Sequence, residues 1–434
     1  MEWTTIGYIA IAALVGLIVL GVPLAFGIAL VAIGGVIALF EPSRAAVLIY
    51  NNLVARGTDF ILASVPLFIF MGQLVFQGNI GRDLYECVHK WFGRLPGGLA
   101  VTAVLTSTGF GAVTGVSAAA VATMAAISLP EMRRYNYNIR LAAGSIATAS
   151  TLAILVPPSI LMIIYGLWTE QNIGALFIAG IIPAIIMSAL FCAYILIRCT
   201  LMPADGPLGP RYPWSERLAS LVKLVPVILI FLIVMGGIYS GTFTPSEAAG
   251  AGSFVVLVLL LLMRRLTWRG FVKAVLDTAR LSVMIFAIFV SVSVFTSFLV
   301  LTDVTGETVG WIADSGLGRY VVLLLIVIVY LIMGMMLDPI GMLLLSLPFV
   351  YPVIVHLGFD PIWFGVICTV LVEIALVTPP VGFNCYILKQ VAGDDVSIVD
   401  IFAGTGPFVL LSLLVIVILT IAPGLATWLP AILL

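Results

Sequence analysis

The chain has 434 residues, of which 62% are hydrophobic and only 9% are charged. A water-soluble protein of this length has no interior large enough to bury so much apolar surface, so the composition indicates a polytopic membrane protein. A net charge of −1 excludes the basic surface that a nucleic-acid-binding protein needs. Two histidines and five scattered cysteines offer neither metal-ligand spacing nor a disulfide framework.

Apolar runs of about 20 residues, the length of a helix that crosses the hydrocarbon core, recur along the chain. In the first half, residues 1–197, they predict scaffold spans within 5–77, an interfacial helix at 79–94, an apolar segment at 97–129, a broken span at 141–169 and a span at 172–197. The segment 97–129 is too long for one span and too short for two spans with a turn. We therefore expect a helical hairpin there that enters the membrane and returns to the same side.

A proline-containing linker at 198–223 separates the two halves and is expected in the cytoplasm. The second half, residues 224–434, repeats the order of the first. It is predicted to contain scaffold spans within 224–300, a hairpin at 320–355, a broken span at 362–389 and a final span at 401–423.

Prolines repeat at a fixed spacing in the two halves. The separation between the pairs Pro157-Pro158 and Pro379-Pro380 is the same as the separation between Pro23 and Pro245. Because proline removes a helix hydrogen bond, each Pro-Pro pair predicts an interrupted membrane helix. Interrupted helices at matching positions indicate an internal duplication and, in a membrane protein, the binding site of a secondary transporter.

The distribution of basic residues orients the halves. If the loops at 78–96, 131–140, 198–223, 264–280 and 389–400 face the cytoplasm, 16 of the 19 Lys and Arg residues lie inside, and Arg44, Arg56 and Arg319 lie outside. Cytoplasmic loops are typically rich in basic residues. The expected fold is therefore an all-α inverted repeat with both termini outside, two re-entrant hairpins that enter from opposite sides, and two broken transmembrane helices.

The tip of the first hairpin, from Ser107 to Ser117, lies in a run of small residues. Most of the residues from Ser107 to Ala126 are Gly, Ala, Ser or Thr. A re-entrant turn leaves backbone groups unpaired at membrane depth, where they must meet protein, water or a ligand. Carbonyl and hydroxyl oxygens suit a hard cation, and the positive end of the helix that starts near Ser117 suits an anion. The alternative is a small-residue face that only packs helices together.

Two acidic residues inside the apolar runs have competing interpretations. Asp338 followed by Pro339 is a typical helix start, with Asp as N-cap and Pro as the first helical residue, yet a carboxylate at membrane depth is also a candidate cation ligand. Glu373 is expected either to bind a coupling proton or ion, or to be a buried, paired structural carboxylate. Proline is expected to start the outgoing half of each broken span, with Thr378 as a cap.

These segments resemble the large membrane subunit of a TRAP (tripartite ATP-independent periplasmic) transporter. The resemblance covers essentially the whole chain, and it is carried by the runs Val65–Gly72, Thr114–Ser117, Leu155–Ile160, Phe243–Ala248, Thr378–Gly382 and Ile401–Pro430. It implies a sodium-coupled symporter of the bacterial inner membrane that imports an organic acid, such as a C4-dicarboxylate, sialic acid or a related carboxylate, by an elevator motion. It also implies a small four-helix membrane subunit and a periplasmic substrate-binding protein as partners, and no cofactor besides Na⁺.

The same resemblance implies where the ligands bind. One sodium site would be formed by Ser107, Gly111, Thr114 and Ser117 together with Ala153 and Val156. The other would be formed by Gly334, Asp338 and Gly341 together with Thr378 and Gly382. The substrate would lie between them, at Ser117, Pro157, Pro158, Ser159, Pro379, Pro380 and Asn384.

Two other functions share parts of this pattern. A carrier of organic or inorganic anions that needs no binding protein could use the same interrupted helices. A membrane-embedded enzyme is the second alternative, but the sequence contains no HExxH motif, no Gly-x-Gly-Asp motif and no paired intramembrane aspartates. We therefore expect a transporter subunit without catalytic residues.

Overall fold

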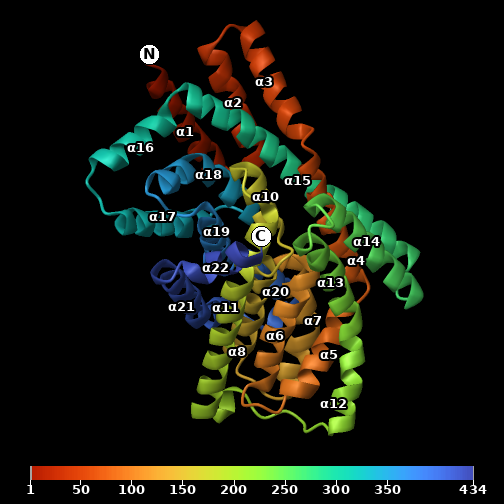
Figure 1. Ribbon diagram of the computed structural model, residues 1–434. Coiled ribbons are helices and arrows are strands. Elements are labelled where there is room, and N and C mark those ends of the chain that lie inside the picture. The colour runs from red at the N-terminus through yellow and green to blue at the C-terminus, as the bar shows by residue number, and fades with distance from the viewer. Residues whose placement is uncertain (1, 434) are drawn as a thin grey trace.

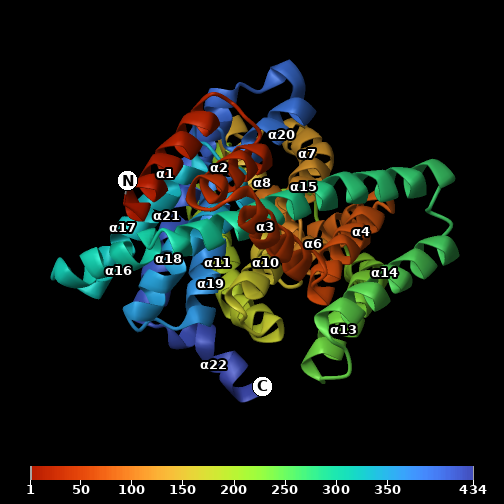
Figure 2. The ribbon, with the colours of Figure 1, turned by 90° about the horizontal axis from the view of Figure 1, so that it is seen from above.

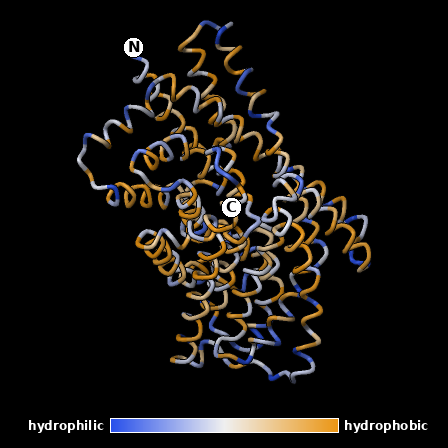
Figure 3. The backbone as a smooth tube through the Cα atoms, in the orientation of Figure 1, coloured by the Kyte–Doolittle hydropathy of each residue, from blue (hydrophilic) through white to orange (hydrophobic). Residues whose placement is uncertain are grey.

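All regular structure in residues 2–433, the part of the chain that the computed structural model describes, is helical (Figure 1). Seven helices of these residues are long and apolar enough to cross a membrane, or up to eight if the bent pair Ile139–Leu155 and Ile160–Thr169 forms one span. Figure 3 shows hydrophobic residues along most helices and hydrophilic residues mainly in the connections. The prediction of an all-helical, multi-pass membrane protein is confirmed.

The first half begins with α1 (Trp3–Val19), α2 (Leu24–Leu39), α3 (Pro42–Gly57), a 3-10 turn (Phe60–Ala63), α4 (Ser64–Gln77) and α5 (Ile80–Phe92). It continues with α6 (Gly98–Thr114), α7 (Ser117–Arg134), α8 (Ile139–Ala149), α9 (Leu152–Leu155), α10 (Ile160–Thr169) and α11 (Ile173–Leu201). A linker follows that contains the short helix α12 (Trp214–Ser220).

The second half begins with α13 (Val225–Tyr239), α14 (Pro245–Leu262), α15 (Trp268–Leu301) and α16 (Val304–Asp314). It continues with α17 (Arg319–Gly334), α18 (Pro339–His356), α19 (Pro361–Ala375), α20 (Phe383–Ala392), α21 (Ile398–Ile421) and α22 (Gly424–Leu433).

Three helices of the first half begin at the same offset from their counterparts in the second half. The starts of α1 and α13, of α7 and α18, and of α8 and α19 are all separated by the same number of positions. This is also the spacing of the proline pairs, so the repeat in the sequence is a repeat in the order and position of helices.

The halves differ where α3 and α4 correspond to the single helix α15. The sequence analysis placed 264–280 in a loop, but α15 already starts at Trp268. The Thr267 hydroxyl caps α15 by accepting a hydrogen bond from the Gly270 N–H at 3.1 Å. With 34 residues, α15 is about 50 Å long at about 1.5 Å per residue. The helix is therefore longer than the hydrocarbon core is thick, and its basic first turns extend beyond the core. These turns are polar because they lie outside the core, and for that reason the sequence analysis predicted a loop there.

Two groups of helices face each other. We call α1–α4 and α13–α15 the scaffold, in which α15 crosses the molecule and packs against α2, α3 and α4 (Figure 2). We call α6–α10 and α17–α20 the block, in which the two halves are joined by contacts of α20 with α7 and α8, and of α9 with α19. Helix α21 packs along α8, so closely that a side chain on Gly144 would collide with the Gly404 backbone.

Candidate functional site

The first hairpin consists of α6 and α7, joined by Gly115 and Val116 only. Its two ends meet the same piece of the linker. The Gly97 N–H, just before α6, donates to the Gly206 carbonyl at 3.0 Å, and the Asn138 N–H, in the turn between α7 and α8, donates to the Asp205 carbonyl at 3.0 Å. Since these acceptors are neighbours in the chain, α7 returns to the end from which α6 starts.

The second hairpin consists of α17 and α18, and its ends also meet. The Arg319 guanidinium lies 5.2 Å from the centre of the Phe359 ring, and the Tyr320 and Phe359 rings are 6.1 Å apart. At the tip, Asp338 is the N-cap of α18 and Pro339 its first residue, and the Asp338 carboxylate accepts from the Gly341 N–H at 3.1 Å. The predicted capping role of Asp338 is confirmed.

Each hairpin packs by a glycine against the interrupted helix of its own half. A Cβ on Gly111 would lie 2.5 Å from Ala153 Cα, and a Cβ on Gly334 would collide with Ala375 Cβ. Ala153 and Ala375 have the same separation as the two proline pairs, so the two contacts occupy equivalent positions. Gly115, with φ of +61°, lies directly against the Pro158 carbonyl. Only a residue without a side chain permits these approaches.

The interruptions lie at the Pro-Pro pairs, but the prolines do not start the outgoing helices. Helix α10 begins at Ile160, and the Ser159 hydroxyl caps it by accepting from the Met162 N–H at 3.3 Å. Helix α20 begins at Phe383 after Gly382, whose φ is +46°. The predictions that proline starts these helices and that Thr378 is a cap are therefore wrong. The Thr378 hydroxyl instead donates to the Ile374 carbonyl, because the cap position falls later, at Gly382.

Asn384 joins the two halves at the site. Its amide donates to the Ser117 hydroxyl at 2.6 Å and to the Ala147 carbonyl at 3.2 Å. Ala147 is near the end of α8, where the Thr151 N–H bonds to the Thr148 carbonyl rather than to Ala147. Asn384 thus supplies a donor to a carbonyl that the break between α8 and α9 leaves free.

A cavity of about 500 Å³ lies between the scaffold and the block. The first residues of four helices line it: Ser117 of α7, Ile160 of α10, Pro339 of α18 and Phe383 of α20. Residues of α4 and α15, including Gln73 and Asp277, form the facing wall. Four helix N-termini direct positive partial charge into one cavity, an arrangement that suits an anion.

The predicted site residues fall into three groups. Ser117 and Asp338 line the cavity, and Asn384 lies directly behind Ser117. Gly111 and Ala153 touch each other, as do Gly334 and Ala375. The remaining predicted residues do not line the cavity, namely Ser107, Thr114, Val156, Pro157, Pro158, Ser159, Gly341, Thr378, Pro379, Pro380 and Gly382.

The scaffold side of the cavity was missed by the sequence analysis. Asp277 lies in the stretch 264–280, which was predicted to be a loop because it is polar. Gln73 lies in a predicted scaffold span. The only signal for Gln73 was its polarity inside an apolar run. No pattern in the sequence indicated that these two residues face the hairpin tips, because the contact depends on how scaffold and block pack.

Glu373 is the most deeply buried acidic residue near the interruptions. It is 1% exposed, and neither carboxylate oxygen has a hydrogen-bond partner within the described residues. No ion pair with it is formed there either. The structure therefore does not provide the pairing expected of a structural carboxylate.

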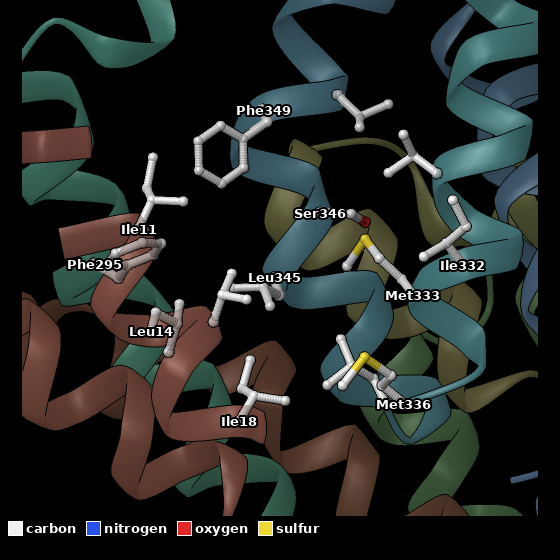
Figure 4. A pocket seen from close by; sticks show the side chains of 14 residues that line it. Ile11, Leu14, Ile18, Phe295, Ile332, Met333, Met336, Leu345, Ser346 and Phe349 are labelled. Carbon is white, nitrogen blue, oxygen red and sulfur yellow. The ribbon is translucent and has the colours of Figure 1, made fainter. Parts of the chain in front are cut away.

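A second cavity, of about 380 Å³, separates the scaffold helices α1 and α15 from the second hairpin (Figure 4). Its lining is apolar except for Ser346, whose hydroxyl donates to the Tyr330 hydroxyl at 2.6 Å. Leu14 and Phe295 face Met333 and Leu345 across it (Figure 4). No charged side chain lines this cavity and its one hydroxyl already donates to Tyr330, so we describe the cavity as an apolar seam between two groups of helices.

An all-helical membrane protein with two hairpins and two interrupted helices around a shared cavity has the architecture of a membrane transporter. The family comparison defines the class further. Residues 11–425 match the family described as "Tripartite ATP-independent periplasmic transporter, DctM component". The chain belongs to this family, and the resemblance found in the sequence is confirmed.

Relatives of known name cover nearly the whole chain. The C4-dicarboxylate TRAP transporter large permease protein DctM of Pseudomonas aeruginosa is 33% identical over 91% of this chain and 91% of its own length. The ectoine/5-hydroxyectoine TRAP transporter large permease protein UehC of Ruegeria pomeroyi is 32% identical over 95% of this chain and 96% of its own. The crystal structure of the Alcanivorax borkumensis YdaH transporter has a similar fold, with a TM-score of 0.58 and 14% identity over 90% of this chain and 89% of that one.

Proposed function

We propose that this chain is the large permease of a sodium-coupled TRAP transporter that imports an organic acid across the bacterial inner membrane. The observation that carries the proposal is the convergence of four helix N-termini, two from hairpins and two from interrupted helices, on one cavity of about 500 Å³. Backbone N–H groups at such termini bind carboxylates without a basic side chain. Relatives named for C4-dicarboxylates and for ectoine support an organic acid as the substrate.

Sodium is proposed to bind on either side of this cavity, at the sites that the sequence analysis assigned. Support for the first site comes from Ser107, which is fully buried and whose hydroxyl has no partner within the described residues. It lies one helical turn before Gly111, where the hairpin touches Ala153. Support for the second site comes from the Asp338 carboxylate at the cavity wall. Hydroxyl, carbonyl and carboxylate oxygens are the donors that a hard cation prefers.

Transport is proposed to occur by an elevator motion, in which the block moves against the scaffold and both hairpins are re-entrant. The meeting of the ends of each hairpin supports re-entrance, and the distribution of basic residues supports two halves inserted in opposite directions. The apolar seam in Figure 4 supports sliding. Within the described residues, no side-chain hydrogen bond joins α1 or α15 to α17 or α18, so a displacement there breaks none.

The family definition supports two partners, a small membrane subunit and a periplasmic binding protein. The decisive experiment is uptake of a radiolabelled organic acid into proteoliposomes that contain this chain and the small subunit. We expect uptake only when an inward sodium gradient and the loaded binding protein are both present. Uptake without the binding protein would favour the independent anion carrier, and uptake without sodium would contradict the proposed coupling.

A further inference from the structure

The lining of the cavity between scaffold and block contains no basic side chain. Of the described side chains that line it, four are polar: Gln73, Ser117, Asp277 and Asp338. Two of these four are acidic. An organic anion in this cavity must therefore be held by backbone N–H groups and by Ser117, because no Lys, Arg or His reaches it.

Two of the four helix N-termini are already occupied by side chains of this chain. Asp338 caps α18 through the Gly341 N–H, and Ser159 caps α10 through the Met162 N–H. A carboxylate from the protein thus takes the position at α18 that a substrate carboxylate would need. These two termini contribute little to a second negative group.

The other two termini are free of side-chain caps and lie together. Helix α7 follows Val116, helix α20 follows Gly382, and neither has a side-chain cap. They are bridged by the hydrogen bond from Asn384 to Ser117. The Ser117 side chain is 4% exposed, accepts from Asn384, and donates to no acceptor among the described residues. The Ser117 hydroxyl can therefore donate a hydrogen bond to a ligand. A carboxylate of the substrate would bind there.

The facing wall offers no positive charge to a second carboxylate, and it offers a row of hydroxyl groups only two polar side chains, Gln73 and Asp277. Phe76, Met284 and Ile285 are apolar, and Asp277 is acidic. Arg280 lies 3.7 Å from Asp277, but the Arg280 side chain is 79% exposed, so this pair is screened by solvent. Burying a charged or hydroxyl group without a partner is costly, and such penalties separate similar substrates by large factors.

We propose that this permease selects monocarboxylates with a largely apolar body over dicarboxylates and polyhydroxylated acids. The inference rests on the proposed function of the cavity as the substrate site. The carboxylate binds at Ser117 and the starts of α7 and α20, and the apolar body lies against α4 and α15. This differs from the C4-dicarboxylates for which the Pseudomonas aeruginosa relative is named.

Three acids with the same six-carbon chain test the selectivity: hexanoate, adipate and gluconate. Binding to the full chain in lipid nanodiscs is measured by calorimetry in sodium chloride and in choline chloride. We expect hexanoate to bind about tenfold or more tightly than adipate or gluconate, in sodium only. Equal or tighter binding of adipate or gluconate overturns the inference and leaves the transporter proposal intact. Sodium-independent binding, or no binding of any acid, contradicts the proposed function and the inference together.

A pair of variants locates the selectivity on the scaffold wall. Asp277→Asn removes the charge that faces a second carboxylate, so we expect the ratio of adipate to hexanoate affinity to rise severalfold. Asp314→Asn is the matched control, because Asp314 is an exposed acid at the end of α16 and should leave the ratio unchanged. An unchanged ratio in Asp277→Asn would show that the wall does not reject dicarboxylates.

Discussion

Asn384 provides the most direct test of the site, because its amide joins the two halves behind the cavity. Asn384→Ala removes the hydrogen bonds to the Ser117 hydroxyl, at 2.6 Å, and to the Ala147 carbonyl, at 3.2 Å. Each hydrogen bond contributes about 1 kcal/mol to stability, and leaving the buried Ala147 carbonyl unpaired costs about 1–3 kcal/mol. We expect a total loss of about 2–4 kcal/mol in the free energy of unfolding.

Part of this loss should appear in substrate binding. Without Asn384, nothing fixes the Ser117 hydroxyl toward the cavity, and the starts of α7 and α20 lose their bridge. We expect the substrate concentration for half-maximal uptake to rise about tenfold, which corresponds to about 1.4 kcal/mol. Uptake by proteoliposomes and thermal unfolding of the purified protein measure the two effects separately.

Asn52→Ala is the matched control in the scaffold. Asn52 accepts hydrogen bonds from the Ser297 hydroxyl at 2.8 Å and the Ser293 hydroxyl at 3.4 Å, and its own amide donates to the Leu48 carbonyl at 3.0 Å. Its removal costs a similar number of bonds at a residue that does not line the cavity between scaffold and block. If both variants lose stability and only Asn384→Ala loses substrate affinity, the bridge belongs to the site. If the two variants change affinity equally, Asn384 is only a structural residue and the reasoning fails.

Three further predictions concern the second hairpin tip, the linker and the seam. Asp338→Asn should keep the helix cap, since Asn is as good an N-cap as Asp, but should raise the sodium concentration for half-maximal uptake severalfold; an unchanged sodium dependence would leave Asp338 as a cap only. Burial opposes ionisation of Asp205, but the hydrogen bonds from Arg198 and an asparagine amide outweigh it and hold the pKa of Asp205 below its usual value. The ionised form is therefore stabilised by folding, so Asp205→Asn should lower the melting temperature at neutral pH, and the difference should vanish as pH falls below about 4; a pH-independent difference would exclude this ion pair as its cause. Leu14→Cys with Met333→Cys, cross-linked by a short bifunctional maleimide, should stop uptake that the uncross-linked protein retains; continued uptake would exclude sliding along the seam.

Hydrophobic run lengths and proline spacing predicted the all-helical class, because both depend on local sequence. The cap at Asp338 was also predictable, since an N-cap and the proline after it are adjacent in the chain. The start of α20 was not, because Gly382 adopts a left-handed conformation that ends the turn later than proline alone would. A local rule gives the existence of an interruption but not the residue at which the next helix starts.

Features that depend on contacts between distant residues were not predictable. The bond between Asn384 and Ser117 joins a hairpin of the first half to an interrupted helix of the second. Helix α3 carries Arg44 and Arg56, and its polarity resembles that of a loop. It is held against α15 by Asn52 and two serines, a stabilisation that no local pattern shows.

The two halves share the contact between a hairpin glycine and an alanine of the interrupted helix, but they differ in their helix caps. A hairpin glycine touches an alanine of the interrupted helix in both halves, yet the hairpin helix α7 starts without a side-chain cap while α18 starts with Asp338. The interrupted helices differ in the opposite sense, since Ser159 caps α10 and no side chain caps α20. The uncapped pair therefore combines a hairpin from the first half with an interrupted helix from the second. The anion position proposed above uses one terminus from each half, so neither half alone could form it.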